Sequence, residues 1–207
     1  MTGEPTVNDA AFWRSLYAQG GDRWELGGPS PSLEAHLARR PLPPGVVAVP
    51  GCGRGHDARL LARLGHHVLA FDFVADTLRV ARELAERDDS PVTFEERDVF
   101  GLAAVYPAIF DGVWEYTCFC AIDPRRRPEY VDVLAAILKP GGWILACFFP
   151  MGDKPGGPPF AVNEGEVREL LAPSFELVED YVPTVSPENR QGREWMVLAR
   201  RRLSGSR

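Results

Sequence analysis

The sequence predicts an α/β fold: a doubly wound, mostly parallel sheet of seven strands that ends in an antiparallel hairpin. Two observations carry this prediction. Short apolar runs alternate with amphipathic helical segments over residues 46–149, and two further strand patterns follow position 175 with no helical pattern between them. Strand–helix alternation with near-continuously apolar strands is typical of a parallel sheet covered by helices on both faces.

The first half of the chain is predicted to form two strand–helix units and a third strand. A β-branched run at 46–50, bounded by proline and glycine, is typical of a buried strand. The helix that follows begins near Asp57 and ends at Gly65, because glycine commonly terminates a helix. The other elements of this half are a strand at 67–73, a helix at 75–87 and a strand at 91–99.

The second half continues the pattern with a strand at 110–116. The clearest amphipathic helix follows and ends at the LKPGG sequence, where proline and glycine interrupt it. The continuously apolar run at 143–149 is what a central strand covered on both faces requires. A short helix at 164–171 and strands at 175–182 and 194–203, joined by SPENRQG, complete the fold, and residues 203–207 are expected to be disordered.

Composition and charge exclude several classes of protein. The chain has 207 residues, of which 45% are hydrophobic and 25% charged, as in an ordinary globular domain. We expect one domain over 1–207, with 1–44 as an N-terminal lid or helical segment and 45–203 as the core. The net charge of −6 argues against nucleic-acid and anionic-membrane binding. Since neither a signal peptide nor a membrane span fits the sequence, a cytoplasmic location is expected.

Two strand ends supply the first candidate site residues, because ligands of open parallel sheets bind at the carboxyl ends of the strands. The first strand runs into Gly51-Cys52-Gly53-Arg54-Gly55, where glycines allow positive φ and close approach of a ligand. The second strand ends at Asp72, about twenty residues further on, the spacing at which a carboxylate meets ribose hydroxyls. A tight turn and an N-cap are the alternative interpretations.

Two more strand ends support a nucleoside site. The third strand ends at Asp98-Val99, which offers a carboxylate to an adenine amino group and a backbone N–H to a ring nitrogen; a surface turn is the alternative. The fourth strand ends at Glu115-Tyr116, close to the centre of the expected cleft. The four strand ends together therefore predict an adenine nucleoside at this edge of the sheet.

Six segments occur in a distinctive order: VPGCGRGHD, FDF, DVF, EYTCFCAIDPRRRP, LKPGG, and FFP followed by GGPPF. In this order they resemble class I S-adenosylmethionine methyltransferases, and more narrowly the thiopurine S-methyltransferase superfamily and its halide/thiol methyltransferase branch. The resemblance covers about residues 12–160. It implies a Rossmann-like fold, S-adenosylmethionine as cofactor, and methyl transfer to a small soft nucleophile (a thiol, thiocyanate or halide), with S-methylation as the leading expectation.

The resemblance also implies roles for individual residues. The cofactor-binding set comprises two glycines for the methionine moiety, three residues for the nucleoside, two lid tryptophans and one residue of the central cleft: Gly51, Gly53, Asp72, Asp98, Val99, Trp13, Trp24 and Tyr116. Tyr116 is also the one candidate for a catalytic residue. Aromatic residues expected in the substrate pocket are Tyr17, Phe119, Phe149 and Phe160. Core or lid packing is the alternative for Trp13, Trp24 and the three phenylalanines.

Methyl transfer from a sulfonium to an anion loses charge, so a dry apolar pocket accelerates it and no elaborate catalytic group is needed. None of the four histidines is expected to act as a general base, and the four cysteines are expected to be buried thiols rather than metal ligands. No metal is therefore predicted. The run Arg125-Arg126-Arg127 is predicted to be solvated, with contact to a ligand carboxylate as the alternative.

Two other functions share part of this pattern. A nicotinamide-dependent oxidoreductase would need G-x-G-x-x-G, but the third glycine here is Gly55, one residue early. A non-catalytic module that binds S-adenosylmethionine would keep the fold without turnover. The acceptor, which could be an aromatic or alkyl thiol, a halide, thiocyanate or a metalloid anion, and the oligomeric state are left open by the sequence.

Overall fold

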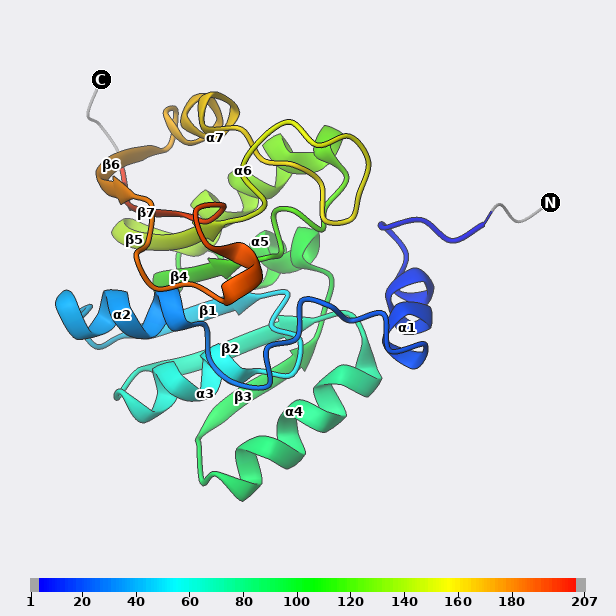
Figure 1. The fold of residues 1–207 in the computed structure, drawn as a ribbon. Helices are drawn as coiled ribbons and strands as arrows, with labels where there is room; N and C mark the ends of the chain where they lie inside the picture. The colour runs from blue at the N-terminus through cyan, green and yellow to red at the C-terminus, as the bar shows by residue number, and fades with distance from the viewer. Residues whose placement is uncertain (1–3, 204–207) are drawn as a thin grey trace.

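A computed structural model describes residues 4–203 of the chain (Figure 1). Its seven strands form one sheet in the order β3-β2-β1-β4-β5-β7-β6. The first five strands are parallel, and β7 runs antiparallel to both β5 and β6, which confirms the predicted sheet and its terminal hairpin. The strands are β1 (Val46–Pro50), β2 (His67–Asp72), β3 (Val92–Glu96), β4 (Phe110–Tyr116), β5 (Leu138–Phe148), β6 (Phe175–Tyr181) and β7 (Trp195–Arg201).

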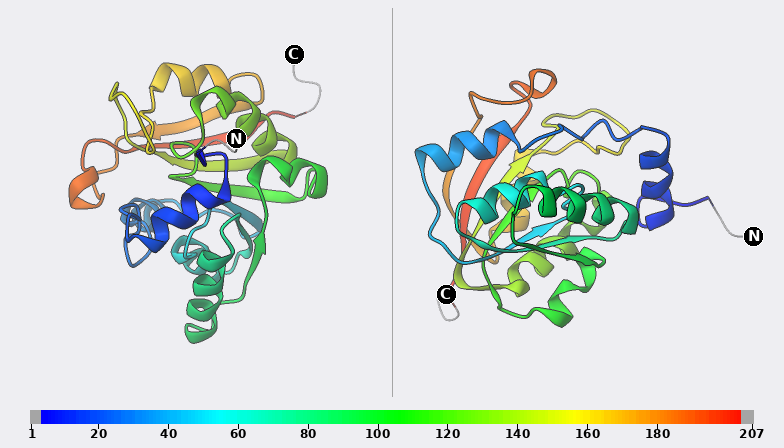
Figure 2. Two further views of the ribbon diagram at one scale, coloured as in Figure 1. Left: turned by 90° about the vertical axis from the view of Figure 1, so that its right-hand side faces the viewer. Right: turned by 90° about the horizontal axis from the view of Figure 1, so that it is seen from below.

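Helices cover both faces of the sheet, as the doubly wound prediction requires. One apolar layer joins the sheet to α2 (Pro31–Arg39), α3 (His56–Arg63) and α4 (Ala75–Arg87). The opposite layer joins it to α5 (Leu102–Val105), α6 (Arg127–Ile137) and α7 (Glu164–Leu171). Helix α1 (Ala10–Ala18) belongs to neither layer and lies beyond one edge of the sheet (Figure 2).

Among the element boundaries that differ from the sequence prediction, the largest differences lie in β5 and β3. Strand β5 begins at Leu138 rather than at residue 143, because Leu138 pairs with Phe110 and the register then shifts, so that Trp143 pairs with Gly112. The LKPGG sequence thus lies in an irregular part of the strand. The third strand ends at Glu96, before the predicted position, since Asp98 starts a short 3₁₀ turn over Val99–Gly101. The expected disordered tail lies, beyond Leu203, outside the described residues.

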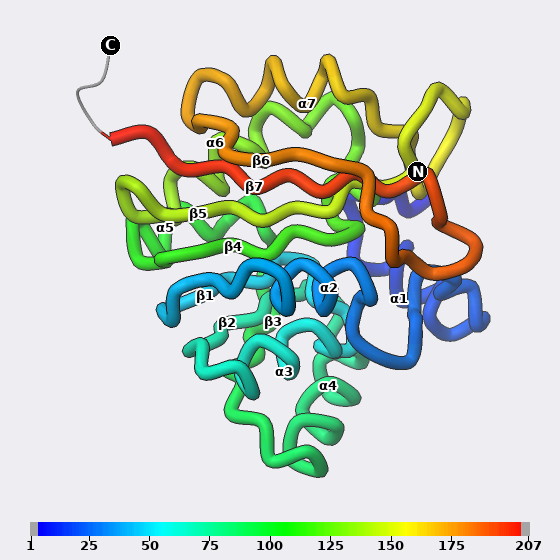
Figure 3. The backbone as a smooth tube through the Cα atoms, turned by 60° about the vertical axis from the view of Figure 1, so that its left-hand side comes forward, coloured from blue at the N-terminus to red at the C-terminus, as the bar shows by residue number. Residues whose placement is uncertain are grey.

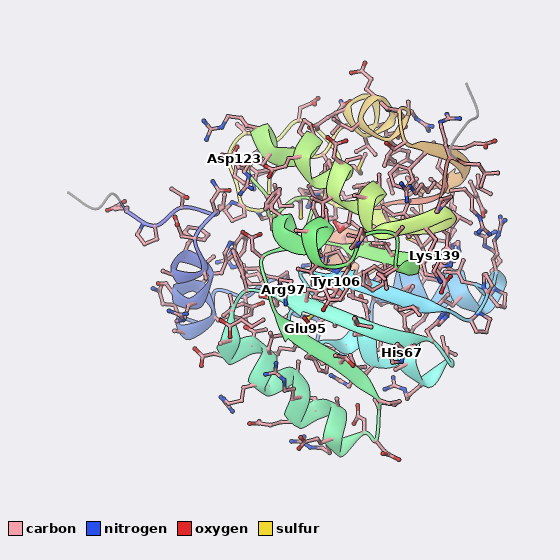
Figure 4. The ribbon with its side chains drawn as sticks, turned by 180° about the vertical axis from the view of Figure 1, so that it is seen from behind. His67, Glu95, Arg97, Tyr106, Asp123 and Lys139 are labelled. Carbon is pink, nitrogen blue, oxygen red and sulfur yellow. The ribbon has the colours of Figure 1, made fainter. Side chains whose placement is uncertain are left out.

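The connection between β6 and β7 reaches the same edge of the sheet as the turns after β1, β2 and β4. Because β7 is antiparallel to both neighbours, β6 runs in the same direction as β5 and ends at the carboxyl edge. The hairpin connection lies there beside the segment that joins α1 to α2 (Figure 3). Figure 4 shows the two edges, with Lys139 and His67 near the amino ends of the strands and Asp123 on the carboxyl side.

Gly112, in the middle of β4, packs directly against a tryptophan of β5. A Cβ atom at this position would overlap the Trp143 indole, and this ring is fully buried. We therefore expect Gly112→Ala to destabilise the protein by about 2 kcal/mol, as overpacking of a core does. Urea unfolding measures this change. Gly101→Ala is the matched control, because no atom lies within 4 Å of its added Cβ, and equal losses in the two variants would contradict the packing explanation.

Candidate active site at the carboxyl edge of the sheet

A cavity of about 700 Å³ lies at the carboxyl edge of the sheet. Its walls come from α1, from the segment that follows it, from the turns after β1 to β4, and from the connections after β5 and β6. This volume is within the range of small-molecule sites. The predicted residues that line it are Trp13, Tyr17, Trp24, Gly51, Gly53, Asp72, Asp98, Val99, Tyr116 and Phe149.

The turn after β1 brings its backbone to the cavity wall. Gly51 and Gly53 have φ values of 62° and 53°, in the left-handed region that favours glycine. A Cβ atom on Gly51 would lie 2.8 Å from the Cys118 sulfur, so the close packing of the turn on the end of β4 requires glycine there. At Gly53 the only atom near an added Cβ is the Tyr17 hydroxyl oxygen at 3.5 Å. The backbone of Gly53 therefore faces open space.

Asp72 fixes this turn from the end of β2. One carboxylate oxygen accepts a hydrogen bond from Gly53 N–H at 3.0 Å, and the other accepts one from Val74 N–H at 3.0 Å. The side chain is buried, and this burial raises the pKa of the Asp72 carboxyl. A carboxylate can accept about four hydrogen bonds, so Asp72 retains acceptor capacity for a ligand in the cavity.

Asp98 forms the turn that was the alternative interpretation and also lies at the cavity, while its adenine role stays a prediction. Its carboxylate caps the 3₁₀ turn by accepting a hydrogen bond from Phe100 N–H at 3.0 Å, and the residue also lines the cavity beside Val99. The Arg126 guanidinium stacks on the neighbouring Phe100 ring, 3.4 Å from its centroid. The end of β3 therefore offers the cavity a carboxylate, an apolar side chain and a cation-covered aromatic ring.

Three aromatic side chains from the N-terminal segment close one side of the cavity. Trp24 packs edge-to-face on Trp13, with ring centroids 5.6 Å apart, and on Tyr17 at 5.3 Å. The indole of Trp13 donates to the Val7 carbonyl at 2.8 Å. The cluster lies within residues 1–44, where the lid is expected; that it acts as a lid stays a prediction.

Ion pairs fasten the lid to the turn after β1. Arg54 pairs with Asp22 at 2.7 Å, and His56 Nε2 lies 2.8 Å from a Glu25 oxygen. The other ring nitrogen of His56 faces an Arg59 guanidinium nitrogen at 3.0 Å. Because arginine can only donate, His56 Nδ1 must accept and Nε2 must carry the proton toward Glu25. His56 thus joins the N-terminal segment to α3, and the expectation that it is not a general base stays a prediction.

Asp57, the last residue of the VPGCGRGHD motif, holds the N-terminal segment to the core. Its carboxylate accepts hydrogen bonds from Ser30 N–H at 2.6 Å and from the Trp114 indole at 2.8 Å. Burial is the main cause that raises the pKa of Asp57. This carboxyl therefore joins the residues before α2 to the start of α3 and to β4.

Tyr116 lies between two buried charges. Its hydroxyl accepts a hydrogen bond from Arg190 at 2.6 Å and donates to Glu194 at 2.7 Å. Burial raises the pKa of Tyr116 strongly. A hydroxyl whose proton is held by a carboxylate is not placed to act as a general base at neutral pH, and the expectation that Tyr116 is a catalytic residue stays a prediction.

Arg190 and Arg193 are site residues that the sequence analysis missed. Both come from the β6–β7 connection and line the cavity, and Arg190 is only 2% exposed. Their guanidinium carbons lie 4.7 Å and 5.3 Å from the Phe149 ring centroid. Arg190 also donates to the Trp24 carbonyl at 3.0 Å. The signal that could have found them is topological, because a hairpin antiparallel to the last parallel strand returns its connection to the carboxyl edge.

Two residues predicted for the substrate pocket lie elsewhere. Phe119 is buried in the core against Phe148, with ring centroids 5.1 Å apart, because the chain after β4 turns back beneath the sheet edge. Phe160 packs on the backbone at Gly157, and its N–H donates to the Cys120 carbonyl at 2.7 Å. Neither ring lines the cavity. The core-packing alternative is therefore the correct one for Phe119.

The arginine run after β4 divides into three environments. Arg125 is exposed and pairs with Asp123 at 2.6 Å, as predicted for a solvated charge. Arg126 lines the cavity, whereas Arg127 is buried and pairs with Glu166 at 2.8 Å. The prediction of a solvated run is thus wrong for Arg127, because α6 begins there and turns its side chain inward.

The remaining expectations concern thiols, metals and membranes. Cys118, Cys120 and Cys147 are buried and Cys52 is half-buried, and burial raises the pKa of all four thiols. Over residues 4–203, no three His, Cys, Asp or Glu side chains are grouped so as to hold a metal ion. Within the same range, no helix has the length and apolar character needed to cross a membrane.

The fold and cavity together define a class of protein. A doubly wound sheet with a glycine turn after its first strand, an acid at the end of its second and a lidded cavity between them is that of class I S-adenosylmethionine-dependent methyltransferases. The chain matches the thiopurine S-methyltransferase (TPMT) family model over residues 8–202, and it belongs to that family. It is therefore an S-adenosylmethionine-dependent methyltransferase, which sets aside the nicotinamide alternative.

Relatives and solved structures agree with this assignment. "Probable thiol methyltransferase 2" of Arabidopsis thaliana is 31% identical over 191 residues, which cover 90% of this chain and 83% of the relative. "Thiocyanate methyltransferase 1" of Brassica oleracea is 29% identical, with 92% and 84% covered. A Burkholderia thailandensis 1,6-didemethyltoxoflavin-N1-methyltransferase, solved with bound S-adenosylhomocysteine, has a TM-score of 0.74 and 27% identity, with 94% of this chain and 87% of that chain covered.

Glu115 is a buried carboxyl just behind the cavity wall. One oxygen accepts a hydrogen bond from Phe119 N–H at 2.6 Å, and the other has no partner among the described residues. Burial raises the pKa of Glu115 to about 8. A carboxyl with a raised pKa in the folded state stabilises the fold below its unfolded-state pKa, and this contribution is lost as the pH rises toward 8.

We therefore expect Glu115→Gln to remove part of the pH dependence of stability. The wild type should lose at least about 3 °C in Tm relative to the variant between pH 5.5 and 8.5, since 1 kcal/mol corresponds to about 2–4 °C in a domain of this size. Thermal melts at both pH values measure the difference. Glu176→Gln, at an exposed position of β6, is the control. Parallel pH profiles for wild type and Glu115→Gln would show that Glu115 is already ionised.

Proposed function

We propose that the chain transfers the methyl group of S-adenosylmethionine to a small anionic nucleophile, with a thiolate as the leading acceptor and thiocyanate or a halide as alternatives. The observation that carries this proposal is the cationic end of the cavity, where Arg190 and Arg193 surround Phe149. Lys154 lines the same cavity, and within residues 4–203 neither Lys154 nor Arg193 has a carboxylate in ion-pair range. Such a surface attracts a soft anion.

The cofactor would occupy the other end, between the lid and the strand ends. Its sulfonium supplies an electrophilic methyl group. The open space beside Gly53 and the spare acceptor capacity of Asp72 fit the methionine moiety and the ribose. Asp98 and Val99 are proposed to contact the adenine, and Gly51 and Tyr116 the centre of the cofactor. Trp13 and Trp24 would cover it, while Tyr17 and Phe149 would border the acceptor.

The residues present favour catalysis by positioning and by exclusion of water. The aromatic lid removes solvent, and the arginines beside Phe149 hold an anion against the cofactor end of the cavity. A thiol with a pKa near 8.5 is already partly a thiolate at neutral pH, so the enzyme can select the anion from solution. His56, the one histidine among the described lining residues, already contacts Glu25 and Arg59.

The relatives named as thiol and thiocyanate methyltransferases support this choice of acceptor. Thiopurine-like aromatic thiols and metalloid anions fall within the same chemistry. We further propose that residues 1–207 act as a single domain, with 1–44 as the lid, and that the enzyme works in the cytoplasm on a small molecule without nucleic-acid or membrane partners.

Turnover with different acceptors tests the proposal. We expect S-adenosylhomocysteine to form with iodide, thiocyanate, hydrosulfide, a small alkyl thiol or an aromatic thiol. For the alkyl thiol, kcat/KM should rise with pH up to about 8.5 as the thiolate fraction grows, whereas for thiocyanate and iodide it should be flat over the same range. Cofactor binding without turnover of any of these acceptors would contradict the proposed function and favour a non-catalytic module.

The ribose role of Asp72 gives a second test. Asp72→Ala should weaken S-adenosylhomocysteine binding by about 2 kcal/mol, because charged hydrogen bonds to the ribose are lost. Calorimetry measures this change. Asp76→Ala, at an exposed carboxylate on α4 that lies 3.9 Å from Arg14, is the control. If Asp72→Ala binds the cofactor as tightly as wild type, the cofactor site is misplaced.

A further inference from the structure

Two buried charges of opposite sign lie side by side without a direct hydrogen bond. Arg190 is 2% exposed and Glu194 is fully buried, and their closest nitrogen and oxygen atoms are 4.0 Å apart. The Tyr116 hydroxyl stands between them, 2.6 Å from the guanidinium and 2.7 Å from the carboxylate. The neutral Tyr116 hydroxyl therefore bridges the arginine and the glutamate by hydrogen bonds.

Each charge has other partners that hold it in this separated state. The second oxygen of Glu194 accepts a hydrogen bond from the Ser32 hydroxyl at 2.5 Å. Arg190 donates to the Trp24 carbonyl at 3.0 Å, and its guanidinium lies over the Phe149 ring. The carboxylate thus interacts with hydroxyl groups, while the guanidinium reaches both the lid and the proposed acceptor end.

A direct pair would be favoured electrostatically in this buried place. Coulomb attraction grows as the distance falls, and a guanidinium and a carboxylate readily form two parallel hydrogen bonds. Such a pair would neutralise Arg190 and draw it away from Phe149. With the hydroxyl between the two charges, the guanidinium stays beside Phe149. Its positive charge is then only partly compensated by Glu194 and can attract an anionic ligand.

We propose that Tyr116 is a positioning residue whose hydroxyl acts as a spacer between Arg190 and Glu194, and so keeps Arg190 available to bind the anionic acceptor. This inference rests on the proposed function, because it assigns an anion to the Arg190 end of the cavity. It gives Tyr116 a role in the choice of acceptor rather than in proton transfer.

Three variants test the spacer. In Tyr116→Phe the ring remains but the hydroxyl is lost, so Arg190 should collapse onto Glu194. Thiocyanate should then bind the complex with S-adenosylhomocysteine about tenfold more weakly, with a similar rise in its KM. Glu194→Gln alone should leave thiocyanate affinity unchanged or higher. The double variant should regain affinity to within about threefold of wild type, because no carboxylate remains to capture the arginine.

Calorimetry of thiocyanate and of S-adenosylhomocysteine provides the readout, with Tm recorded for each variant. Affinity for S-adenosylhomocysteine should change less than about threefold in Tyr116→Phe, since the ring contact persists. Glu179→Gln is the matched control, because this glutamate pairs with Arg39 and Arg40 outside the cavity. A crystal structure of Tyr116→Phe should show a direct Arg190–Glu194 pair, a test that does not depend on the folding of the double variant.

Several results would overturn the inference. In Tyr116→Phe, these are an unchanged affinity for thiocyanate, an equal loss of affinity for thiocyanate and S-adenosylhomocysteine, or a crystal structure in which Arg190 and Glu194 remain separated. A double variant that binds thiocyanate no better than Tyr116→Phe would also overturn it. If wild type binds thiocyanate but methylates no acceptor, only the proposed function fails, because the spacer is tested by binding. If wild type does not bind thiocyanate, the proposed anion site and the spacer both fail.

Discussion

The hydrogen bond from Gly53 N–H to the Asp72 carboxylate is the constraint on which the site depends. It ties the turn after β1 to the end of β2, across two neighbouring parallel strands. The turn can follow this path only because its glycines adopt positive φ, and Gly51 must also leave room for Cys118. Burying the Asp72 carboxylate would cost free energy unless it were hydrogen-bonded, and the backbone N–H groups of Gly53 and Val74 supply these bonds. The same carboxylate fixes the turn and lines the cavity.

The N-terminal segment turns this open edge into a cavity. Asp57 holds the backbone at Ser30, Arg54 pairs with Asp22, and His56 contacts Glu25. The three contacts come from one motif, at residues 54, 56 and 57. The segment that forms the turn after β1 therefore also holds the N-terminal segment in place, so one short stretch of chain supports two walls of the cavity.

Much of this organisation was predictable from the chain because it depends on local patterns. Hydrophobic periodicity and the positions of glycine and proline predicted the strands at 46–50 and 110–116 and the helices at 75–87 and 164–171 with the observed bounds. Spacing and motif order predicted that Asp72, Asp98 and Tyr116 would face the same cavity. The inward turn of Arg127, the burial of Phe119 and the cavity position of Arg190 were not predictable from such patterns, because each depends on contacts with distant segments.

The sequence by itself determined the α/β class, the strand-end acids, the glycine turn and the family, since short-range periodicity and motif spacing encode them. Only the tertiary structure decided which charges meet. Arg190 and Glu194 follow Tyr116 by 74 and 78 positions along the chain. Their contact exists because β7 pairs antiparallel to β5 and carries the hairpin connection back to the carboxyl edge. The cationic end of the cavity thus arises from long-range strand pairing, which no local pattern records.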